Sequence, residues 1–107
     1  MRIDHGEGTD GLTGQQLVVV AAPGKSPGEV ALHWPERRIL LVGDACVGKP
    51  PGECALLPDK VIDDKSTLIE SLRRLSRLDF DSLLVGDGAS ILEGGRAALE
   101  RLVARLS

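Results

Sequence analysis

The chain has 107 residues, 42% of them hydrophobic, and a formal net charge of −3 at pH 7. A chain of this length forms one small domain, here residues 1–107, that buries roughly two thirds of its unfolded surface. Because lysine and arginine are scattered among acidic residues, we expect no nucleic acid and no anionic membrane as partner, and the lack of a targeting signal or long apolar run predicts a cytoplasmic protein.

The first half of the chain predicts three strands. Its first 15 residues are rich in Gly and Asp, which is typical of a lead-in with little regular structure, here with one short edge strand near Ile3. Apolar runs bounded by Gly and Pro then predict strands at 16–22, 29–34 and 39–43. The segments between them are a tight loop at 23–28 and a turn at PERR.

An irregular connection runs from residue 44 to about residue 65 and contains three prolines. A loop of this length without secondary structure is usually functional. Cys46 and Cys54 lie in it on either side of a Pro-Gly turn. They could form a disulfide, but two cysteines without a secretion signal are more often free thiols.

The end of the chain predicts a helix, a strand and a second helix. Apolar residues at helical spacing predict helices over 66–78 and from about 92 to 106, with a strand at 82–86 between them. Two glycines weaken the first turn of the second helix. Each helix start is predicted from a pair with capping-box spacing, Thr67 with Glu70 and Ser90 with Glu93.

The predicted sheet has two apolar faces. Three strands, LVVVA, ILLV and LLV, are apolar at every position, a pattern typical of a sheet buried on both sides. Two helices can cover one face of a sheet about 19 Å wide and 17 Å long. We therefore expect an α+β fold in which a mainly antiparallel sheet of about four strands carries two helices on one face. The other face either joins a second copy in a homodimer or is covered by the connection 44–65.

Residues 39–53, ILLVGDACVGKPPGE, match the opening of a phosphate-binding loop, with Gly43, Gly48 and Lys49 at the required spacing. Such a loop needs Ser or Thr after the lysine and must lead into a helix. Here two prolines follow, and Asp44 would place a carboxylate in an anion site. The sequence therefore argues against nucleotide binding.

The order of these segments resembles a known family. Residues 18–53, VVVAAPGKSPGEVALHWPERRILLVGDACVGKPPGE, and residues 80–103, FDSLLVGDGASILEGGRAALERLV, are similar to the C-terminal half of a metallo-β-lactamase-fold hydrolase. In that family a strand leads to a TPGHTPG-like loop, the second of two following strands ends in GD, and a later strand ends in a Gly-rich turn. The resemblance covers residues 9–107 and implies half of a four-layer αββα sandwich.

The metal-ligand positions of the family are mostly changed. Its main motif, two histidines spaced by one residue and then an Asp-His pair, belongs to the missing N-terminal half, and the chain has only His5 and His33. At the positions that the resemblance covers, Asp44 keeps the metal-bridging aspartate, Lys25 replaces a histidine, and Asp87 takes the last position. Lysine offers donors and no acceptor, so we expect no bound cofactor. We interpret His33 as a surface histidine with a satisfied hydrogen bond.

We interpret Lys25, Asp44 and Asp87 as a vestigial site, in which the ammonium supplies the positive charge of the lost metal. The alternative is that they are three separately solvated loop residues. If a metal such as zinc or iron does bind, Asp44 and Asp87 are the candidate ligands, or Asp44 with His5 and one cysteine.

Because most of the family's metal ligands are missing, the resemblance implies a non-catalytic, metal-free half domain. This half domain homodimerises through its open sheet face as a binding or structural module. The alternative is a metal-dependent hydrolase, with a rebuilt site or with a complementary histidine-rich half supplied by another chain. Spacing suggests no Ser-His-Asp or Cys-His arrangement, so we assign no catalytic residue.

Overall fold

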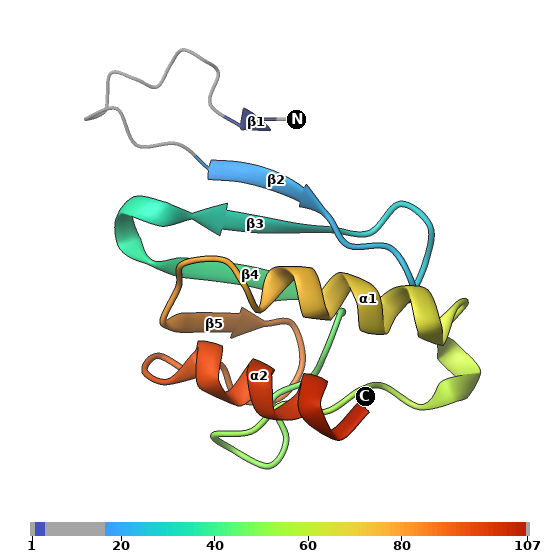
Figure 1. Cartoon of the computed structure of the whole chain (residues 1–107). Coiled ribbons are helices and arrows are strands. Elements are labelled where there is room, and N and C mark those ends of the chain that lie inside the picture. Colours follow the sequence, from blue (N-terminus) through green and yellow to red (C-terminus); the bar gives the residue numbers. More distant parts are fainter. Residues whose placement is uncertain (1, 4–16, 107) are drawn as a thin grey trace.

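The computed structural model describes residues 2–3 and 17–106, which form a five-stranded sheet with the strands in chain order (Figure 1). Strands one to four pair antiparallel, and the fifth lies parallel to the fourth. The strands are β1 (Arg2–Ile3), β2 (Leu17–Ala21), β3 (Val30–Trp34), β4 (Ile39–Gly43) and β5 (Ser82–Val85). The predicted strands, including the short edge strand near Ile3, are therefore confirmed with small changes at their ends.

Both helices, α1 (Lys65–Leu75) and α2 (Gly95–Leu106), lie on the same side of the sheet (Figure 1). Their apolar faces share one core cluster with the facing side of β4 and β5, and the most deeply buried members are fully inaccessible, among them Leu40, Leu83, Leu72 and Leu99. This arrangement confirms the α+β half sandwich with a mainly antiparallel sheet. Within the described part of the chain, no helix has the length and apolar character needed to cross a membrane.

The start of α1 differs from the predicted capping box because Asp64 is the N-cap. Its Oδ1 accepts the backbone N–H of Thr67 at 3.1 Å. This hydrogen bond favours the ionised carboxylate, so it lowers the pKa of Asp64. Thr67 lies inside the helix, where Glu70 forms an ion pair with Arg73 at 2.6 Å. The predicted capping pair was therefore wrong. Asp64, which precedes the apolar repeat, accepts the backbone N–H that has no partner within the first turn of the helix.

The start of α2 was also predicted too early. Residues before the helix extend along the outer edge of β5, where Ile91 and Leu83 exchange backbone hydrogen bonds of 2.8 and 2.7 Å. The hydroxyl of Ser90 accepts the backbone N–H of Val85 at 3.0 Å instead of capping the helix. α2 can therefore begin only at Gly95.

The connection between β4 and α1 packs on the helix side of the sheet. Arg101 of α2 pairs with Glu53 at 3.0 Å, and Arg105 donates to the carbonyl oxygen of Cys54 at 2.7 Å. The alternative in which this connection covers the second face of the sheet is therefore wrong, because α2 holds it on the face that the helices cover. Two short 3₁₀ helices occupy segments predicted as turn or irregular chain, Pro35–Arg37 and Asp59–Val61.

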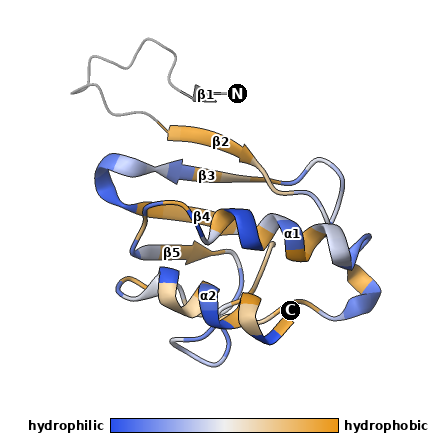
Figure 2. Cartoon of the chain, in the orientation of Figure 1, coloured by the Kyte–Doolittle hydropathy of each residue, from blue (hydrophilic) through white to orange (hydrophobic). Residues whose placement is uncertain are grey.

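The second face of the sheet, which we call the open face, is apolar. Strand register aligns one row of side chains across four strands, Val19, Leu32, Leu41 and Leu84. All four are only half-buried, and Val30 beside them is 47% exposed. Figure 2 shows the apolar character of β2 and β4 in the sheet. A hollow of about 380 Å³ lies in this face, lined by Val30, Leu32, Leu41, Gly43, Leu84, Val85 and Gly86.

Candidate functional site

The candidate site lies where β4 and β5 end. Because these two strands are parallel, their carboxyl ends meet at one edge of the sheet, and the N–H of Gly86 donates to the carbonyl oxygen of Gly43 at 3.0 Å. Asp44 follows β4, and Asp87 follows Gly86 after β5. The predicted acidic residues therefore share this edge, which also bounds the hollow in the open face.

Lys25 reaches the same edge from the loop between β2 and β3. Its Nζ lies 3.9 Å from Oδ2 of Asp44, and its side chain is 28% exposed against 53% for the aspartate. The carbonyl oxygen of Lys25 accepts the N–H of Asp63 at 3.1 Å, so the residues before α1 fix the loop. The structure thus brings together two of the three residues predicted for the vestigial site.

Asp87 has a different partner from the one that the sequence suggested. Its Oδ2 lies 3.7 Å from Nζ of Lys49, and both side chains are more than half exposed. The edge therefore carries two ion pairs, Lys25 with Asp44 and Lys49 with Asp87. The sequence contained no signal for the second pair, because it depends on the connection after β4 returning to lie beside the turn after β5.

Close backbone packing produces that second pair. The N–H of Gly48 donates to the carbonyl oxygen of Asp87 at 3.0 Å, and the carbonyl oxygen of Gly48 accepts the N–H of Ala89 at 2.9 Å. A Cβ at Gly48 would clash with the carbonyl oxygen of Ala89. The GK dipeptide that resembles a phosphate loop therefore serves chain packing, and a turn rather than a helix follows Lys49.

The residues at this edge do not fit a metal centre of the kind expected from the family. A catalytic zinc needs about three protein ligands, and within residues 2–3 and 17–106 no group of three His, Cys, Asp or Glu side chains could hold an ion. Asp44 faces an ammonium, which is a competitor of a metal and not a co-ligand. Of the makeshift ligands, His5 lies outside the described residues, and both cysteines are buried in the core.

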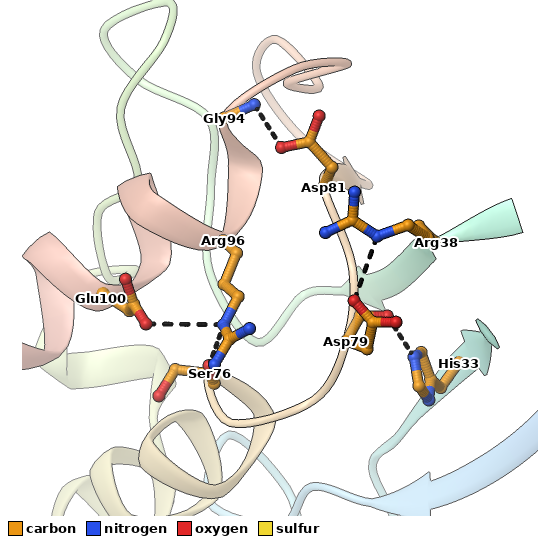
Figure 3. Close-up of polar contacts among 8 residues, drawn as sticks. All are labelled: His33, Arg38, Ser76, Asp79, Asp81, Gly94, Arg96 and Glu100. Atoms are coloured by element: carbon orange, nitrogen blue, oxygen red, sulfur yellow. Dashed lines mark hydrogen bonds and ion pairs between the residues drawn. The ribbon is translucent and has the colours of Figure 1, made fainter.

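His33 is placed away from the candidate site. It lies on the core face of β3, is only 8% exposed, and its Nε2 donates to the carbonyl oxygen of Asp79 at 2.8 Å (Figure 3). The expected hydrogen bond is therefore present, but the histidine is buried and not on the surface. The carboxylate of Asp79 binds Arg38 at 3.0 Å, and Asp81 caps the turn before α2 through the N–H of Gly94 at 2.9 Å. These contacts fix the chain between α1 and α2.

Known proteins share this fold. The family model described as "Metallo-beta-lactamase superfamily" matches residues 4–106. A metallo-beta-lactamase family protein from Thermus thermophilus is 27% identical over 87% of this chain and 31% of its own, with a TM-score of 0.63. An archaeal superfamily protein from Sulfolobus tokodaii is 20% identical, with 88% and 35% covered and a TM-score of 0.69.

A metallo-beta-lactamase from Pontibacter korlensis is 18% identical, with 91% of this chain and 45% of its own covered and a TM-score of 0.66. No curated protein matches the sequence. The chain thus spans less than half the length of each of these solved structures.

Proposed function

Since the chain belongs to the metallo-beta-lactamase superfamily, we propose that it is a non-catalytic half domain that pairs with a second copy of itself through the open face. In the dimer, two sheets stack with their helices outside. The row of Val19, Leu32, Leu41 and Leu84 carries the proposal, because half-buried aliphatic side chains aligned across four strands need an apolar partner. A twofold axis through this face would place the row of one chain against the same row of the second chain.

The size of the open face predicts a weak dimer. Four strands of about five residues give a flat area of about 300 Å² per chain. This is at the lower end of functional apolar patches, and stable interfaces bury about 800 Å² of accessible surface per partner. We therefore expect a dissociation constant in the micromolar range.

Trp34 is the expected anchor of this interface. It ends β3 on the open face, is half-buried, and its Nε1 is buried without a hydrogen-bond partner in the described part of the chain. The guanidinium of Arg37 lies 5.3 Å from the centre of its ring. Tryptophan and arginine are the residues that most often dominate interface energies.

The lack of catalysis is proposed from the charges at the strand ends. The ammonium of Lys25 lies beside Asp44, so the aspartate needs no metal to offset its own charge. The same ammonium would repel a divalent ion from this position. The ion pair therefore supports a role in stabilising the strand ends.

Sedimentation of the purified chain over a range of concentrations tests the dimer. The wild type should approach the mass of two chains at hundreds of micromolar, whereas Leu41→Asp should remain monomeric with an unchanged circular dichroism spectrum, because it places a charge in the centre of the row. Leu92→Asp is the matched control. Leu92 is 68% exposed and lies beside the outer edge of β5, where its carbonyl oxygen accepts the hydroxyl of Ser82. A wild type that stays monomeric at all concentrations would contradict the proposal.

The second candidate is a hydrolase whose histidine-rich half comes from another chain. This candidate is favoured because the chain covers less than half of each solved structure. Most of each matched protein therefore has no counterpart in this chain. The hydrolase candidate predicts stoichiometric zinc or iron, and hydrolysis of a thioester, lactone or phosphodiester that Asp44→Ala abolishes. A purified dimer with neither metal nor activity would favour the module.

A further inference from the structure

Cys46 and Cys54 are brought together by a small backbone bridge that follows the strand-end site. Val47 and Ala55 pair antiparallel and exchange hydrogen bonds of 2.8 and 2.9 Å. In such a pair, the residues that precede the two partners lie diagonally on the same face. Both thiols are directed into the core cluster, with 0% and 1% exposure, and each thiol is close enough to shift the pKa of the other.

We propose that Cys46 and Cys54 form a reversible dithiol site that small-molecule disulfides of the glutathione class oxidise to an internal disulfide. The site is separate from the edge that carries the ion pairs, and it does not depend on the proposed dimer. Its product is a cross-link that closes the segment 47–53. The two thiols lie on one face of the bridge and share the core cluster in the reduced fold, so their joining requires a local adjustment of the backbone and no rearrangement of the sheet.

Cys54 is the thiol that reacts first. The hydrogen bond from Cys46 lowers the pKa of Cys54, and the guanidinium groups of Arg101 and Arg105 act in the same direction against burial and Glu53. The same hydrogen bond, together with burial, raises the pKa of Cys46. A thiolate is therefore favoured on Cys54, and Cys46 keeps its proton until the second step.

The reaction is two successive thiol–disulfide exchanges. The Cys54 thiolate attacks one sulfur of the small disulfide, forms a mixed disulfide and releases one thiolate. That thiolate or solvent takes the proton of Cys46, whose sulfur then attacks the Cys54 sulfur and releases the second thiol. The two cysteines lose two electrons and two protons in total, which the small disulfide receives as two thiols.

The tip of the segment provides access to the buried thiols. Residues 49–52 are exposed, and the ion pair of Glu53 with Arg101 joins this tip to α2 at the surface. Opening the tip would break that contact and the exposed ion pair of Lys49 with Asp87, and would leave the sheet and both helices in place. Closure by the disulfide would also restrain Gly48, whose N–H binds the carbonyl oxygen of Asp87, so oxidation would stiffen the strand-end edge.

Native oxidation followed by intact mass measurement tests the site. The folded wild type, incubated with oxidised glutathione, should lose about two mass units and both reactive thiols, and dithiothreitol should restore them. Peptide mapping should recover one cross-linked fragment containing both cysteines. Cys46→Ser should stop as a mixed disulfide with glutathione at Cys54, and Cys54→Ser should react at least about tenfold more slowly than Cys46→Ser.

Two results would overturn the inference. One is a wild type that stops at the mixed disulfide. The other is a wild type that reacts only in denaturant, as shown by thiols that stay reduced in native buffer and oxidise after unfolding. Because a serine variant can fail to fold, the wild-type mass and peptide map decide the outcome without the variants.

Discussion

The two faces of the sheet differ in burial although the side chains on both faces are apolar. Leu40 and Leu41 are neighbours on β4, yet Leu40 is fully buried under the helices and Leu41 is half-exposed on the open face. The same contrast separates Leu83 from Leu84 on β5. An apolar strand therefore does not define its own burial. The layer packed against each face defines it, and only one layer is present among the described residues.

The largest expected difference between the faces is in the free energy of unfolding. Leu40→Ala should lower it by about 2–5 kcal/mol, because the surrounding core cannot close the cavity. Leu41→Ala, on the same strand, should lower it by less than about 1 kcal/mol when the protein is dilute and monomeric. Urea denaturation of both variants measures this contrast. Equal losses would mean that the open face is as buried as the core face.

Overpacking gives the next largest effect. Gly95 lies against β5, and a Cβ there would come within 2.7 Å of the Leu83 Cβ. Gly95→Ala should therefore displace α2 and lower the free energy of unfolding by about 1–3 kcal/mol, despite the better helix propensity of alanine. Gly28→Ala is the control, since a Cβ added at Gly28 would meet no other atom within 4 Å. An unchanged denaturation midpoint for Gly95→Ala would contradict this tight contact.

A smaller effect is expected for self-association at the end of the open face. Trp34→Ala should raise the dimer dissociation constant about tenfold, which corresponds to about 1.4 kcal/mol. Sedimentation over a concentration range measures it, with Leu92→Ala as the variant that should leave association unchanged. A dimer unaffected by Trp34→Ala would place the interface elsewhere.

The smallest effect concerns the cap of α1 on the helix layer. The pKa of Asp64 is lowered in the fold from 3.8, so its charged form stabilises the protein above that pH and the contribution disappears as the pH falls through the lower folded value. Asp64→Asn keeps a capping side chain but removes the charge. The stability difference between wild type and Asp64→Asn, followed by thermal unfolding from pH 7 to pH 3, should therefore shrink toward acid. A difference that stays constant with pH would contradict this role of the carboxylate.

The sequence predicted the elements better than their ends. Strand 39–43 was placed correctly, because a continuous apolar run bounded by a turn and Gly-Asp leaves little choice. Both predicted capping pairs were wrong, because the side chains that bind the first backbone N–H groups of the helices lie outside those pairs. Asp64 caps α1 from just before the helix, and Asp81 binds the N–H of Gly94 from the chain before β5.

The sequence also located part of the candidate site. It placed Lys25 and Asp44 at one edge through the order of the family's segments, and the two side chains are 3.9 Å apart. It did not find the contact of Lys49 with Asp87, and it left open whether the two cysteines come together. Each of these depends on how the connection 44–64 returns to the sheet and to α2, and no local pattern encodes that return.

The sequence by itself determined a sheet that is apolar on both sides, two amphipathic helices, and polar residues that follow the ends of two strands. These properties follow from the spacing of side chains along short segments, where the periods of strands and helices act directly. Only the tertiary structure decided which face the helices cover, that α2 holds the connection away from the open face, and which charges and thiols meet. Those outcomes depend on packing between segments far apart in the chain, where shape and competing hydrogen bonds select one arrangement among several that the local pattern allows.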